Sequence, residues 1–165
     1  MSIEDILERF GPVCLDRKYT QQLTSNHNIV AETKELNFPS RIESVDEAAA
    51  DAEAFAREMG LADDMIFAID LAVRESMANA VKHGNKFDEN KKVEVTLAET
   101  GRGFEVSVRD FGTGFSVDEI PDPTDRENLL KASGRGILFM RSFMDEVEWA
   151  HPEGGGLIVK MVKNR

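Results

Sequence analysis

The stretch Glu75-Ser-Met-Ala-Asn79-Ala-Val-Lys-His83-Gly84-Asn85 decides the fold of this 165-residue chain more than any other. Glu75, Asn79 and His83 are each four residues apart, so they share one stripe of a helix. The other large side chains of this helix are apolar: Ile66, Phe67, Ile69, Leu71, Val73, Met77 and Val81. A helix that is apolar nearly all round is predicted to be buried, and its polar groups then need partners.

A Mg²⁺ ion with a bound phosphate would supply such partners, because Mg²⁺ takes oxygen ligands and keeps substrate phosphates in its shell. Asn79 is the expected metal ligand, since its amide carries a neutral oxygen. The plain alternative is a solvated helix face that carries a carboxylate and an amide. The helix alone does not separate these two interpretations.

Two glycine clusters favour a nucleotide site. The first, Val108-Arg-Asp110-Phe-Gly112-Thr-Gly114-Phe115, follows an alternating strand pattern. Asp110 can accept a hydrogen bond from an amino group of a base, and Gly112 and Gly114 let backbone approach a ligand closely. The alternative is a turn that contains an aspartate and two glycines.

The second cluster is Ser133-Gly134-Arg135-Gly136-Ile137-Leu138, which opens an apolar helical stretch. Glycines that lead into a helix N-terminus make an anion site from free N–H groups and the helix dipole. Arg135 adds a bidentate donor suited to phosphate. A flexible loop with a solvated arginine is the alternative.

The order Glu-x-x-x-Asn-Ala-x-x-His, Asp-x-Gly-x-Gly-Phe and Gly-Arg-Gly-Ile resembles the GHKL (Bergerat-fold) ATPase superfamily. Within it, the chain is most similar to the bacterial anti-sigma-factor serine/threonine kinases. The run Gly134-Arg-Gly-Ile-Leu-Phe-Met-Arg-Ser-Phe-Met-Asp-Glu-Val-Glu148 is especially similar, and the resemblance extends from about residue 34 to the C-terminus. It implies the cofactors ATP and Mg²⁺, and sigma-factor or antagonist partners.

The function expected from this resemblance is transfer of the ATP γ-phosphate to a serine of a partner antagonist protein. Glu75 is the expected catalytic base, and the expected nucleotide-binding residues are Asn79, His83, Asp110, Gly112, Gly114, Gly134, Arg135, Gly136 and Ile137. For His83 a structural hydrogen bond is an equal alternative. The competing function is a non-catalytic, ATP-binding regulatory module that sequesters a sigma factor or other partner. No paired-helix segment supports a histidine kinase, and a gyrase-type or chaperone-type machine needs further domains.

Two further features bear on the nucleotide. Residues 116–132 carry two prolines and five acids, and in the resembled family this position is a lid over the nucleotide; a plain surface loop is the alternative. The family often has a threonine after the glycines that precede the last strand, where this chain has Leu157. A hydroxyl contact near the adenine is then missing, so base recognition depends more on Asp110.

The predicted fold class is α+β, a two-layer sandwich of a mostly antiparallel mixed sheet with helices on one face. The predicted elements are a strand near 35–41, helices over 44–59 and 63–84, and two hairpins, 92–98 with 103–109 and 147–150 with 157–162. Ser44-x-x-Glu47 has the form of a capping box, and Asp63 or Asp64 is the expected cap of the second helix.

Composition agrees with one soluble domain: 41% of the residues are hydrophobic, no apolar run can span a bilayer, and the N-terminus lacks signal-peptide features. A single cysteine, Cys14, favours a cytoplasmic location. A formal charge of −11 disfavours nucleic acid and fits a basic protein partner.

The expected domains are an N-terminal extension (1–34) and an ATP-binding domain (35–165). Ile3, Ile6, Leu7 and Phe10 make an apolar stripe on a helix too short to be stable alone. The stripe is expected to dock on its own domain or on a second copy in a homodimer, or else to remain disordered.

Overall fold

The computed structural model describes residues 32–113 and 135–165, with the backbone alone at Arg135. In chain order its elements are β1 (Glu32–Pro39), α3 (Glu43–Glu58), α4 (Asp63–Asn79), the π-helical turn η1 (Ala80–Gly84), β2 (Lys92–Thr100), β3 (Gly103–Arg109), α5 (Arg135–Phe143), β4 (Glu146–Ala150) and β5 (Ile158–Asn164). None of the helices in these ranges is long and apolar enough to cross a membrane.

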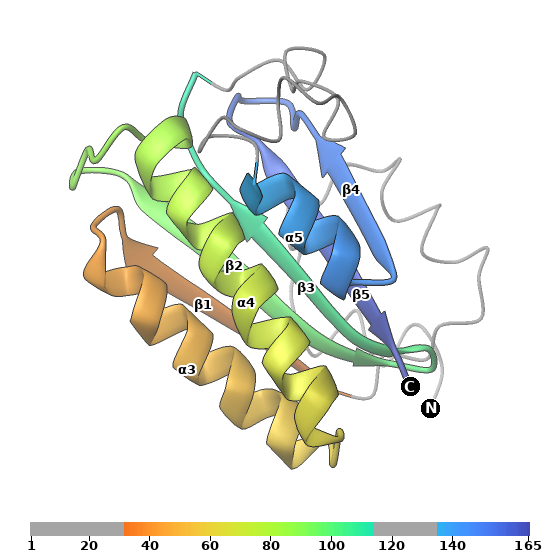
Figure 1. Cartoon of the computed structure of the whole chain (residues 1–165). Coiled ribbons are helices and arrows are strands. Elements are labelled where there is room, and N and C mark those ends of the chain that lie inside the picture. The colour runs from red at the N-terminus through yellow and green to blue at the C-terminus, as the bar shows by residue number, and fades with distance from the viewer. Residues whose placement is uncertain (1–31, 114–134) are drawn as a thin grey trace, which may run out of the picture.

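The fold is an α+β sandwich of two layers, which confirms the predicted class. The five strands have the order β1-β2-β3-β5-β4, and every pairing between them is antiparallel. The three helices cover one face of this sheet, with α4 between α3 and α5 (Figure 1). β1 begins at Glu32, three residues before the predicted strand, and its first residues pair with the end of β2.

The core lies between the two layers, because the strands alternate buried and partly exposed residues as a half-buried sheet requires. On β2 the buried residues Val93, Val95 and Leu97 face the helices, and Leu97 lies opposite Val106 of β3. Phe104 of β3 is fully buried and meets Phe55 of α3 edge to face, with the ring centres 6.1 Å apart. This packing fixes the helical layer over the sheet.

The helix ends differ from those predicted. The capping box is wrong: α3 starts one residue after Ile42, and the Ser44 hydroxyl donates to the carbonyl of Pro39 at 2.8 Å. Neither Asp63 nor Asp64 is the N-cap of α4, which is Ala62; Asp64 instead accepts from the neighbouring Met65 N–H. The charges of these aspartates still lie at the positive end of the helix dipole.

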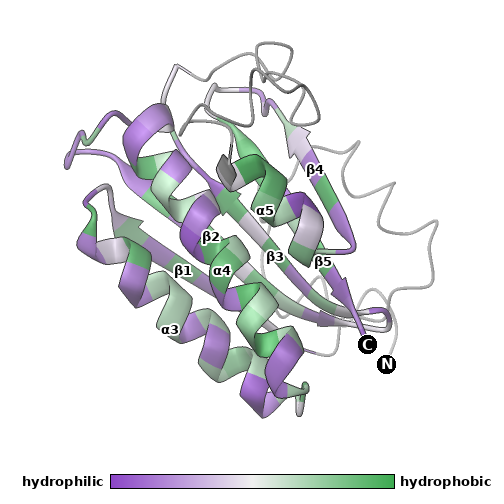
Figure 2. Cartoon of the chain, viewed as in Figure 1, coloured by the Kyte–Doolittle hydropathy of each residue, from purple (hydrophilic) through white to green (hydrophobic). Residues whose placement is uncertain are grey.

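The prediction that the α4 helix is buried all round is also wrong. Ile69, Val73 and Met77 are buried against the sheet, whereas the side chain of Phe67 is 58% exposed. Figure 2 shows hydrophobic colour on α5 and on the adjoining part of α4, on the side of the helical layer that faces the viewer. The apolar residues of α4 therefore serve two surfaces, one inside the core and one outside it.

Candidate functional site

The predicted stripe on α4 is only partly realised. Glu75 and Asn79 lie one turn apart near the end of α4, and both are partly exposed. The last turn, Ala80–Gly84, is a π-helix, which winds more residues into a turn than the α-helix before it. His83 therefore leaves the spacing of Glu75 and Asn79, and it is exposed. The structure places Glu75 and Asn79 together against Gly136, whereas the contact of His83 with the nucleotide stays a prediction.

Asp110 lies immediately after β3 and is only 4% exposed. Its backbone N–H donates to the carbonyl of Leu157 at 3.0 Å, and its Oδ1 accepts from the N–H of Gly112 at 2.9 Å. Burial raises the pKa of Asp110, while the backbone hydrogen bonds from Gly112 and Leu157 and the nearby charges of Lys91 and His151 oppose that rise. A buried carboxylate with a raised pKa is typical of a functional site.

Three glycines surround Asp110 and make room for it. A Cβ on Gly84 would lie 2.3 Å from the Asp110 Cγ, and one on Gly112 would lie 1.8 Å from the carbonyl oxygen of Gly84. On the third side, a Cβ on Gly156 would lie 2.1 Å from the carbonyl oxygen of Asp110. Any other residue would overlap its neighbour at these positions, so the glycines of three separate segments form one cradle.

Asn85 holds this cradle together, and the sequence assigned it no role. It is 2% exposed. Its Oδ1 accepts from the N–H of Phe111 at 2.9 Å, and its Nδ2 donates to the carbonyl of Lys92 at 2.9 Å. One buried amide thus connects the end of η1, the start of β2 and the loop that follows Asp110. In the sequence, the available sign of this role was that an asparagine directly follows the glycine that ends the helix.

Gly136, in the first turn of α5, lies against Glu75. A Cβ added there would lie 2.5 Å from Glu75 Oε2 and 3.7 Å from Asn79 Nδ2. The start of α5 therefore approaches the two polar residues of α4 closely, as the glycine predicted for this position allows. Gly114 and Gly134, also predicted for the site, lie outside the described residues, as do residues 116–132 and the side chain of Arg135.

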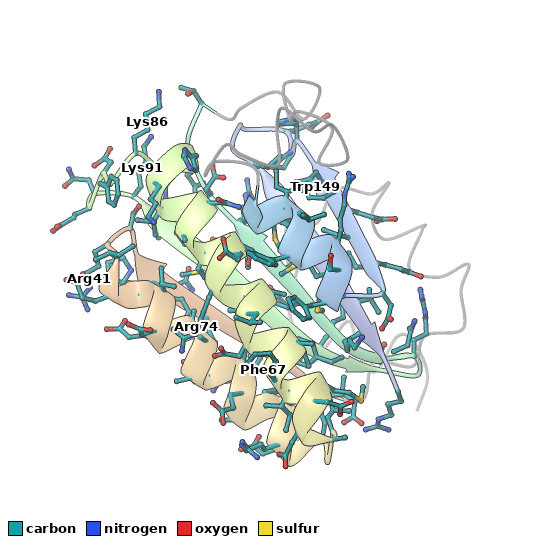
Figure 3. The ribbon with its side chains drawn as sticks, in the orientation of Figure 1. Arg41, Phe67, Arg74, Lys86, Lys91 and Trp149 are labelled. Carbon is teal, nitrogen blue, oxygen red and sulfur yellow. The ribbon has the colours of Figure 1, made fainter. Side chains whose placement is uncertain are left out.

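A pocket connects these groups. It is lined by residues from α4 and η1 (Ser76, Asn79, Ala80), from β3 and the position after it (Val108, Asp110), from α5 (Ile137) and from the β4–β5 hairpin (Trp149, Leu157, Val159). Apart from Asp110, Asn79 and Ser76, its walls are apolar. Trp149 was missed by the sequence analysis; Figure 3 shows it beside α5 on β4, and the Arg141 guanidinium lies 5.0 Å from its ring centre.

The chemistry of the pocket lining suits a purine base. Apolar walls around one buried carboxylate suit a flat base that presents an amino group. No group of three or more His, Cys, Asp or Glu side chains able to hold a metal occurs within residues 32–113 and 135–165.

Comparison with known proteins gives a consistent assignment. The sequence model of the histidine kinase-like ATPase domain matches residues 38–163. An anti-sigma F factor of Geobacillus thermodenitrificans is 32% identical over 114 residues, which cover 68% of this chain and 78% of that protein. The serine-protein kinase RsbW of Bacillus subtilis is 29% identical over 126 residues, which cover 73% and 79%.

The fold also matches a solved structure. The crystal structure of the RsbU and RsbW domains of a Mycobacterium tuberculosis protein aligns with a TM-score of 0.60 and 20% sequence identity. The alignment covers 81% of this chain and 32% of that longer one. The ATPase domain matched by sequence implies ATP binding. The chain therefore belongs to the histidine kinase-like ATPase domain family, among relatives named anti-sigma F factor and serine-protein kinase RsbW.

Proposed function

We propose that this chain is an ATP-dependent protein serine kinase of the anti-sigma-factor type, which phosphorylates a serine of a partner antagonist protein in the cytoplasm. The observation that carries the proposal is the position of Glu75. It lies one helical turn before Asn79, is partly exposed, and approaches the start of α5 at Gly136. A protein that only binds ATP does not need a carboxylate there.

Each residue of the site has a proposed role. Asp110 accepts a hydrogen bond from the amino group of the base, and the glycine cradle keeps its carboxylate fixed. Asn79 offers its amide oxygen to Mg²⁺, which, when bound, neutralises phosphate charge. Arg135 and the N–H groups at the start of α5 hold the phosphates, since a helix N-terminus favours anions.

Glu75 is proposed to take the proton of the attacking serine hydroxyl. It is separated from Asn79 by one turn, a rise of about 6 Å along the helix axis. That spacing lets one residue contact the hydroxyl while the other contacts the metal.

A binding-only regulator is the second proposal, and one pocket residue, Leu157, favours it. Leu157 occupies the position where relatives of the resembled family often carry a threonine, and it is 3% exposed in the pocket wall. Trp149 fills part of the same wall. In this alternative the chain sequesters a sigma factor or another partner, and ATP acts as a structural ligand.

Purified protein should be incubated with γ-labelled ATP, Mg²⁺ and candidate antagonist proteins. The Glu75→Gln variant is expected to bind Mg·ATP normally while phosphate transfer falls by roughly 10²–10⁴-fold, the range for loss of a general base. The matched Asn79→Ala variant should instead lose the Mg²⁺-dependent part of its ATP affinity. Wild-type protein that binds Mg·ATP yet transfers phosphate neither to any candidate nor to water would favour the binding-only regulator.

A further inference from the structure

The outer surface of the helical layer carries three phenylalanines that touch one another. Phe67 of α4 is 58% exposed, Phe139 of α5 is 43% exposed, and Phe143 is partly exposed. The rings of Phe67 and Phe143 meet edge to face with centres 6.3 Å apart, and those of Phe139 and Phe143 stack at 6.2 Å. Figure 3 shows Phe67 on the half of α4 remote from η1. We call these three residues the aromatic patch.

The aromatic patch is unusual for the described part of the chain. There, only two other large hydrophobic residues are exposed, Ile42 and Phe87, and neither shares an aromatic contact with another. Scattered single residues are normal on a surface, whereas a contiguous aromatic cluster marks a docking site. None of the proposed roles in ATP binding uses these rings, and none of the three is among the residues that line the pocket.

The start of the described chain lies at the same end of the molecule as Phe67. Glu32 pairs with Glu99, and the Arg165 guanidinium donates both to Glu99 at 2.5 Å and to the carbonyl of Met59 at 3.2 Å. Met59 follows the last turn of α3, and α4 begins four residues later at Asp63. In Figure 1, β1 accordingly starts at the end of the sheet where α4 begins. The segment that precedes Glu32 therefore leaves the domain near the aromatic patch.

That segment contains a fitting occupant. Ile3, Ile6, Leu7 and Phe10 recur at helical spacing and make a stripe two turns long, which needs an apolar surface to be stable. Residues 11–31 connect the stripe to β1, and 21 residues can span up to roughly 70 Å when extended. Both the chemistry and the reach agree with the aromatic patch.

We propose that the apolar stripe of residues 3–10 docks on the aromatic patch of its own chain, as an amphipathic helix laid across α4 and α5. Docking would cover the exposed faces of Phe67 and Phe139. The proposal does not depend on kinase activity, because none of the three rings lines the pocket.

The single cysteine gives a direct test, because Cys14 lies four residues beyond Phe10. A nitroxide attached to Cys14 of the full-length, ¹⁵N-labelled protein should broaden the amide signals of Phe67, Phe139 and Phe143. The signals of β1 and β2 at their far ends should stay sharp. Ile6→Glu with Leu7→Glu should abolish the broadening without shifting the core signals. Unbroadened aromatic-patch signals in the wild type would overturn the proposal.

Two controls separate the alternatives. Phe67→Ser should release the segment and restore the Phe139 and Phe143 signals, whereas Phe87→Ser, the same change at an exposed residue beyond the other end of α4, should leave the broadening intact. A mixture of ¹⁵N-labelled Cys14→Ser protein with unlabelled, nitroxide-bearing protein should show no broadening. Broadening that appears in this mixture would mean that a second copy occupies the patch, and would overturn docking within one chain.

Discussion

Replacing Asp110 by asparagine separates the recognition of the base from the stability of the fold. The substitution keeps the shape of the side chain. An asparagine Oδ1 can still accept from the Gly112 N–H, now 2.9 Å from the Asp110 Oδ1. The other position then carries an NH₂ group, which repels the amino group of the base. Rotating the amide to avoid this repulsion would sacrifice the bond from Gly112.

The expected loss of affinity follows from one charge-assisted hydrogen bond. Such bonds contribute about 1.5–3 kcal/mol, so the dissociation constant for ATP should rise by roughly 10- to 150-fold. Isothermal titration calorimetry with wild type and Asp110→Asn measures it. Unchanged ATP affinity in a folded variant would refute the role of Asp110 in base recognition.

The stability of the same variant should change in the opposite direction. Burial raises the pKa of Asp110 above its usual value near 3.8, so the folded state binds this proton more tightly than the unfolded state does. The stability gained in this way is fully present at pH values below the pKa of Asp110 in the unfolded state. It is lost as the pH rises through the pKa of Asp110 in the folded state. Asparagine stays neutral throughout. Urea unfolding should therefore show that Asp110→Asn gains stability over wild type as pH rises from 4 to 8; a variant that loses stability at pH 7 would contradict this.

Three further predictions concern the walls of the pocket. Gly84→Ala would place a Cβ 2.3 Å from the Asp110 Cγ, so it should destabilise the fold by about 1–3 kcal/mol and weaken ATP binding, as unfolding and calorimetry would show. Trp149 is the only tryptophan and lines the pocket, so ATP should change the intrinsic fluorescence of the protein, and Trp149→Phe should abolish that signal while binding persists. Leu157→Thr adds a hydroxyl to the pocket and should tighten ATP binding by roughly 2- to 10-fold, which corresponds to one neutral hydrogen bond; equal or weaker affinity would show that the hydroxyl makes no contact there.

The layers of the fold were predictable from periodicity. The alternation of β2 and β3 and the apolar stripe of α4 each depend on local sequence, and the structure confirms the hairpins and the helices on one face. The helix caps were not predictable, because Ser44 found a tertiary partner in the Pro39 carbonyl instead of capping α3. A capping motif takes account only of hydrogen-bond partners that are close in the sequence, so it does not predict a partner from another element.

The candidate site was predictable only where spacing or glycines marked it. Glu75 and Asn79 share a helical turn, and Gly112 was expected beside Asp110, whereas the parts that Gly84 and Gly156 play around Asp110 appear only in the fold. No residue pattern predicted the π-helical turn that follows Asn79 and carries His83.

Trp149 could not be placed from the sequence. It reaches the pocket because β4 pairs with β5 and β5 pairs with β3, where Trp149 lies opposite Val159 and Val159 lies opposite Val108. All three line the pocket, although β3 is far in the chain from the β4–β5 hairpin. The pairing order of strands, rather than any local motif, brings such residues together.

The central claim is that the buried Asp110 carboxylate, which lies in the glycine cradle, accepts a hydrogen bond from the amino group of adenine. Titrating the wild-type protein with ATP and with inosine triphosphate tests it most directly, because the two nucleotides differ at the amino group that Asp110 would contact. The account predicts that ATP binds at least about tenfold more tightly, since a carbonyl in that position would face the carboxylate and leave it unpaired. Equal affinities for the two nucleotides would contradict it.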